Sequence, residues 1–141
     1  MKRLVLAISV FFVGEAAAQQ TDCARPAAPT FAAPATAGAL AQPQIEQHRA
    51  ARDAYFVTAD AHLACLDRTI NARIQTLFAS GAPMDAAMRQ LGAAHEDASR
   101  ERAAVYERFL RLCLAWEDAR HMALPGGCAP ALQGGTSLPK N

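Results

Sequence analysis

From Pro43 to Ala79 the chain reads PQIEQHRAARDAYFVTADAHLACLDRTINARIQTLFA, with no glycine and no proline after its first residue. Proline suits the first position of a helix, because its φ is already helical and its missing N–H would have no partner there. Apolar or long side chains recur here at alternating steps of three and four residues, which is the spacing of a coiled-coil seam. The seam positions are Ile45, Arg49, Arg52, Phe56, Ala59, Leu63, Leu66, Ile70, Arg73 and Leu77. The spacing predicts one long helix over 43–79.

A second stretch, 83–123, has the same spacing and follows the break at residues 80–83. Gly81 suits the left-handed conformation that ends helices, and Pro83 suits the first position of the next one. Asp85 would then face the positive end of the helix dipole. The seam positions are Met84, Met88, Leu91, His95, Ala98, Arg102, Val105, Phe109, Leu112, Trp116 and Ala119. We therefore expect a second helix over about 83–123, stopped by the proline and glycines at 125–127.

The two seams mirror each other about the turn. If the chain folds back near Gly81, five pairs of seam residues fall at matching levels: Leu77 with Met84, Ile70 with Leu91, Leu63 with Ala98, Phe56 with Val105, and Ile45 with Trp116. This pattern predicts an all-α fold, an antiparallel two-helix hairpin that resembles a coiled coil, over residues 43–124. Two helices of a larger bundle remain the alternative, since Arg49, Arg52 and Arg102 lie on the seam and are expected to extend over its edges. A hairpin core is thin, so it needs the chain ends, disulfides or a second copy to cover it.

The ends of the chain differ from the helices in composition. Lys2 and Arg3 precede an apolar run over 4–13, and three alanines at 16–18 suit a signal peptidase. We expect residues 1–18 to be a signal peptide cleaved after Ala18, which would place the protein in the periplasm. The apolar run is too short to span a bilayer, so no stable membrane insertion is expected after cleavage. Residues 19–42, rich in Pro and Ala, are expected to form an extended arm, and 125–141 a flexible tail.

Export gives the four cysteines a structural role, because an oxidising compartment favours disulfides. In the hairpin register Cys65 lies level with residue 96, about 25 Å along the helix from Cys113, whereas a disulfide needs Cα atoms within ~7 Å. Cys128 would have to return about 40 Å to reach Cys65, on five residues that span roughly 17 Å. The remaining pairs are Cys23 with Cys65 and Cys113 with Cys128, which would staple the arm and the tail each to its own helix.

Several of these residues resemble a group of small exported alphaproteobacterial proteins of unassigned function. In that group a Cys-x-x-Pro arm precedes a helix with Tyr-x₆-Tyr-x₂-Cys-Leu, and a second helix carries Glu and Phe-Asn positions. Here the arm has Cys23-Ala-Arg-Pro26, the first helix has Tyr55 and Cys65-Leu66, and the second has Glu101 and Phe109. His62 stands where the second tyrosine is expected. The resemblance covers Cys23 to Leu112 and implies the pairing of Cys23 with Cys65, but it implies no activity.

Composition and motifs reduce the number of function classes that the chain could belong to. The chain has 141 residues with 14 basic and 13 acidic side chains, so it lacks the net basic charge of nucleic-acid binders. It contains no Cys-x-x-Cys, phosphate-binding loop or Gly-x-Ser-x-Gly motif, and we expect neither an enzyme nor a cofactor. The acidic side chains on the outer helix faces are expected to be solvated charges near arginines: Asp60, Asp67, Glu107 and Glu117.

Three hypotheses of function remain. The first is a non-enzymatic periplasmic structural or protein-interaction module whose partner is an envelope protein or a second copy, as a homodimer. The second is a small periplasmic protein similar in general plan to lysozyme inhibitors. The third is a metal carrier, because His62, Cys65 and His95 fall at one level and are ligand types for zinc or copper if Cys65 is reduced. Satisfied core residues and a disulfide explain the same three side chains, so no metal ligand is assigned.

Overall fold

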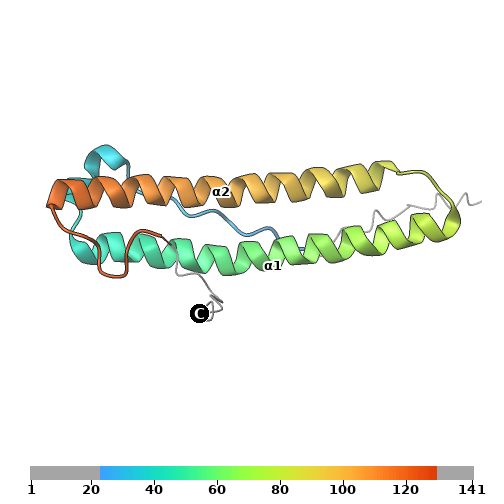
Figure 1. The fold of residues 1–141 in the computed structure, drawn as a ribbon, viewed down its shortest axis with the longest axis horizontal. Coiled ribbons are helices and arrows are strands. Elements are labelled where there is room, and N and C mark those ends of the chain that lie inside the picture. Colours follow the sequence, from blue (N-terminus) through green and yellow to red (C-terminus); the bar gives the residue numbers. More distant parts are fainter. Residues whose placement is uncertain (1–22, 130–141) are drawn as a thin grey trace, which may run out of the picture.

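A computed structural model describes residues 23–129. The expected signal peptide, the first residues of the arm (19–22) and most of the tail (130–141) lie outside the described residues. Two long helices, α1 (Gln42–Ser80) and α2 (Ala86–Arg120), lie side by side in opposite directions (Figure 1). A short 3-10 helix, η1 (Pro34–Ala39), precedes α1, and residues 23–129 contain no strand. The predicted all-α hairpin is confirmed.

Contacts across the seam establish the register of the hairpin. Arg102 Nε lies 2.6 Å from Asp60 Oδ1, and His95 Nε2 lies 3.1 Å from Asp67 Oδ1. In the register predicted from the mirrored seams, the two residues of each pair lie within one residue of the same level. Asp60 and Asp67 are solvent-exposed as expected, but they bridge the two helices rather than only facing water. Polar pairs therefore reinforce the thin apolar seam.

The start of α2 differs from the sequence-based prediction. The helix begins at Ala86 rather than at Pro83, because the Asp85 side chain accepts a hydrogen bond from Met88 N (2.9 Å) and acts as the N-cap. Met84 consequently lies in the connecting loop and is largely exposed, not paired with Leu77 in the core. At its other end α2 stops at Arg120 rather than residue 123, with His121 in the left-handed conformation. Gly81 ends α1 in that same conformation, as predicted.

The loop joining the helices has a titratable cap. The Arg73 guanidinium, followed by the Met88 N–H, lowers the pKa of Asp85 below its ordinary value of 3.8. A lowered folded-state pKa means that this carboxylate stabilises the fold above pH 3.8, and that the contribution disappears as the pH falls toward the folded-state pKa.

We expect Asp85→Asn to lower the midpoint of thermal unfolding at neutral pH, because asparagine keeps the cap but loses the charge that faces Arg73. The difference from the wild type should shrink as the pH is lowered below 3.8. Circular dichroism melts over a pH series measure it, with Asp118→Asn on the exposed surface of α2 as the control. A difference that is independent of pH would show that the charge contributes nothing.

The core occupies only the part of the hairpin nearer the chain ends. Every buried residue of 23–129 lies within 37–66 or 98–128, and the core is largest where α1 begins and α2 ends. Its principal cluster is Ala37, Ile45, Phe109, Leu112, Cys113, Trp116, Leu124 and Cys128. We call this covered part the braced half and residues 67–97 the bare half, in which no side chain is buried. The bare half is therefore a two-helix projection from a packed base.

The arm and the tail explain why one half is packed. Residues 23–33 run without regular structure along the hairpin, from a disulfide between Cys23 and Cys65 toward the start of α1 (Figure 1). Residues 34–39 are helical rather than extended, and Gly38 comes so close to α2 that an added Cβ would lie 3.1 Å from the Ala119 Cβ. At the other end a disulfide joins Cys113 to Cys128. Residues 125–129 accordingly form a turn packed on the helices, not the start of a flexible tail.

Candidate functional site

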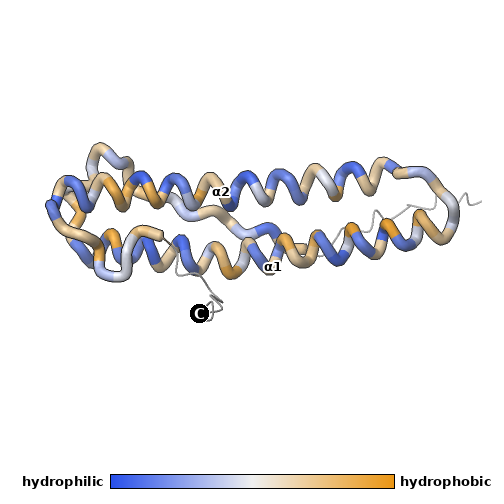
Figure 2. The backbone as a smooth tube through the Cα atoms, viewed as in Figure 1, coloured by the Kyte–Doolittle hydropathy of each residue, from blue (hydrophilic) through white to orange (hydrophobic). Residues whose placement is uncertain are grey.

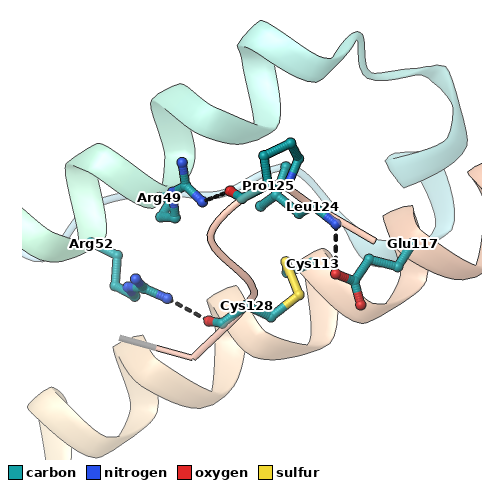
Figure 3. The surroundings of a disulfide bond; sticks show 7 residues. All are labelled: Arg49, Arg52, Cys113, Glu117, Leu124, Pro125 and Cys128. Atoms are coloured by element: carbon teal, nitrogen blue, oxygen red, sulfur yellow. Dashed lines mark hydrogen bonds between the residues drawn. A yellow bond between two sulfur atoms is a disulfide. The ribbon is translucent and has the colours of Figure 1, made fainter. Parts of the chain in front are cut away.

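The base of the braced half is organised around a buried arginine. Arg52 is only 1% exposed, and its Nη1 donates a 2.6 Å hydrogen bond to the carbonyl oxygen of Cys128 (Figure 3). Its Nε and Nη2 donate to Asp53 Oδ1 at 2.8 and 2.6 Å, and its guanidinium lies 4.4 Å from the centroid of the Phe109 ring. The expectation that Arg52 extends over the edge of the seam is wrong. The turn at 125–129 covers that edge and offers a carbonyl in place of water.

Further contacts fix that turn. Arg49 Nη1 donates to the carbonyl oxygen of Pro125, and Leu124 N donates to Glu117 Oε1 at 2.8 Å (Figure 3). Gly126 and Gly127 both have positive φ, 84° and 74°, which L side chains rarely adopt. Glu117, expected as a solvated charge, instead accepts a backbone hydrogen bond. These contacts anchor the end of the described chain on the helices.

The residues that carry the family resemblance hold the arm. Arg25 Nη2 lies 2.6 Å from Glu101 Oε2, and the Glu101 hydrogen bond raises the pKa of Arg25. Tyr55 is buried beside the arm, and burial, followed by the Glu101 charge, raises its pKa. Phe31 of the arm packs edge-on against Phe109, with ring centroids 5.7 Å apart. These contacts hold the arm against both helices.

Two of the three side chains of the metal hypothesis are otherwise occupied. Cys65 is bonded to Cys23, and His95 contacts Asp67. His62 is buried, and its Nδ1 has no hydrogen-bond partner. Asp67 lies five residues after His62 and therefore on a different side of α1. His95 contacts Asp67 on that side. With the disulfide formed, His62, Cys65 and His95 do not make a shared ligand set.

Another group of metal-ligand types lies at the base. The Sγ atoms of Cys113 and Cys128 and a carboxylate oxygen of Glu117 lie within 4.8 Å of one another. Both sulfur atoms are used in the disulfide, and Glu117 binds Leu124 N. In this state the group is structural.

The bare half presents apolar side chains to solvent. Phe78 is 88% exposed and Ile74 47%, and Val57, on the same side of α1 but in the braced half, is 60% exposed. Apolar positions are visible near the turn on both helices (Figure 2). We call Val57, Ile74 and Phe78 the outer apolar set. Ile74 directly follows the seam residue Arg73, whereas Val57 and Phe78 lie outside the three-and-four spacing of the seam and cannot be found from it. The signal that could have found them is their own spacing, since Val57 and Phe78 are separated by three heptads.

Within residues 23–129 neither helix is both long and apolar enough to cross a membrane. The two disulfides fit an oxidising compartment. No protein-family model, curated protein or solved structure matches the chain.

Proposed function

We propose that this chain is an exported, non-enzymatic protein-interaction module of the periplasm. In this proposal the braced half is the scaffold and the bare half carries the binding surface. The uneven distribution of the core carries the proposal. A monomeric soluble protein gains stability by burying large apolar side chains, and here Phe78 and Ile74 stay in water on a regular, rigid helix. Aromatic side chains in such positions are typical binding anchors.

Two further features support this function. The basic, apolar and small-residue order at 1–18 is that of a secretory signal, and two disulfides need an oxidising compartment to persist. The polar side chains of the braced half bind the arm and the turn at 125–129. Catalysis would require such groups to be free to meet a substrate.

Site-specific photo-crosslinking in the exporting cell tests the proposal. A benzophenone amino acid in place of Phe78 should give an adduct with a protein, because the side chain would lie in the interface. The control is the same substitution at Leu114, which is 51% exposed but lies on α2 within the braced half. The chain should be found in the periplasmic fraction, beginning at residue 19.

An adduct from Phe78 and none from Leu114 supports the interaction module. Equal labelling at both positions, or labelling at neither, would contradict it. Recovery of the chain from the cytoplasm with residues 1–18 intact would contradict export.

A further inference from the structure

The bare half has features that match a copy of itself, and we propose that two chains associate through this half and the adjoining residues 57–66 of α1 as a symmetric antiparallel four-helix bundle. This inference rests on the proposed function and names the partner that the surface binds. A twofold contact uses one patch on both chains, so each feature must meet its complement after the rotation. The shape, the charges and the exposed apolar side chains of the contact face must each meet this requirement.

Ile74 and Gly92 lie on one face of the bare half. Ile74 and Gly92 each directly follow a seam residue, Arg73 and Leu91, at equivalent heptad positions. In an antiparallel pair such flanking positions of the two helices lie on the same side. One side of the bare half therefore presents Ile74 from α1 and Gly92 from α2.

Gly92 marks the point where two copies can approach most closely. It lies inside α2, where glycine costs about 1 kcal/mol relative to alanine, and an added Cβ would meet nothing within 4 Å. The fold of a single chain therefore gives no reason for a glycine at this position. A second helix crossing at Gly92 does, because the missing side chain lets two backbones approach.

The charges around Gly92 are complementary under the same rotation. Arg89 and Glu96 are exposed, lie one heptad apart on the same line of α2, and have Gly92 and Ala93 midway between them. A twofold axis at this midpoint places Arg89 of one copy against Glu96 of the other, twice. In the single chain Arg89 makes only a 3.4 Å hydrogen bond to the Met84 carbonyl, and Glu96 lies 4.0 Å from Arg100. Both charges are thus available for the contact.

The same arrangement covers Phe78 of the outer apolar set. The contact between His95 and Asp67 places Gly92 level with Ile70, and Phe78 lies eight residues beyond that level toward the turn. In the second copy the equivalent level on the other side of the axis is residue 62. Phe78 would lie over the exposed Ala61 and Ala64 there, next to Val57. The large side chain meets small ones, as close packing requires.

Sedimentation equilibrium of the full oxidised chain over a range of concentrations tests the dimer. Gly92→Leu should abolish it while leaving the helical circular dichroism spectrum intact, because an added Cβ meets no atom within 4 Å in the single chain and leucine is a better helix former. Arg89→Glu should raise the dissociation constant about tenfold, since it sets like charges opposite each other twice. The double variant with Glu96→Arg should restore dimerisation. Leu114→Asp is the control and should leave the dimer unchanged.

A monomer at every concentration, or a dimer that Gly92→Leu and Arg89→Glu leave unchanged, would overturn the inference. The crosslink from Phe78 separates this failure from that of the proposed function. An adduct of twice the chain's mass supports the dimer. An adduct with a different protein, formed by a chain that is monomeric, would overturn the dimer and leave the interaction module standing.

Discussion

Replacing Cys23 and Cys65 together by alanine should lower the free energy of unfolding by about 4 kcal/mol, the largest effect that we expect from any side-chain change. The disulfide closes a loop with a sequence separation of 42, and opening it restores that conformational freedom to the unfolded chain. The arm would then be held by noncovalent contacts alone, chiefly the exposed pair of Arg25 with Glu101 and the packing of Phe31. Exposed ion pairs contribute roughly 0–1 kcal/mol.

Urea denaturation followed by circular dichroism measures this loss. The matched variant lacks Cys113 and Cys128, whose sequence separation is 15, and should lose about 3 kcal/mol by the same loop-closure relation. Equal stability of the Cys23/Cys65 variant and the wild type would mean that the arm docks without its covalent link. A larger loss from the Cys113/Cys128 variant would show that packing at the base outweighs loop entropy.

Arg52→Ala should destabilise the fold by about 3 kcal/mol, through lost packing on Phe109 and an unsatisfied carbonyl at Cys128. Arg52→Met separates the two causes, because methionine retains contact with the ring but donates no hydrogen bond. We expect it to lose less than the alanine variant. Thermal and urea unfolding give both values.

Arg111→Ala is the matched control. Arg111 is 64% exposed and lies 3.9 Å from Glu107 one helical turn away, so its removal should change stability by less than about 0.5 kcal/mol. If Arg52→Ala behaved like Arg111→Ala, the buried guanidinium would be incidental to the base. Protection of the Leu124 and Gly127 amides from hydrogen exchange should fall in Arg52→Ala and stay unchanged in Arg111→Ala.

The sequence predicts the helices well because their signals are local and repeated. The seam spacing extends over many turns of each helix, and the glycine at 81 fits a helix end on its own. The boundary of α2 is less certain from sequence, since Pro83 and Asp85 are both good starting residues and the side-chain hydrogen bond to Met88 decides between them. The cysteine pairing follows from the helix rise once the turn is placed.

The candidate site is less predictable because it depends on contacts between distant segments. Arg52 lies on the seam by spacing, and its burial depends on a turn 76 residues away along the chain. Phe78 and Val57 look like ordinary surface positions until the structure shows how much of each is exposed. Gly92 attracts attention only when the space around it is known.

The antiparallel helical hairpin, its register and the two compatible cysteine pairs can be predicted from the sequence, because helix periodicity and chain reach are local properties. The folded chain alone reveals which half of the hairpin is packed, that Arg52 is buried and that the outer apolar set remains exposed. These outcomes depend on where the arm and the turn at 125–129 dock. Docking is governed by hydrogen bonds and packing between segments far apart in the chain, which no periodic pattern within either segment encodes.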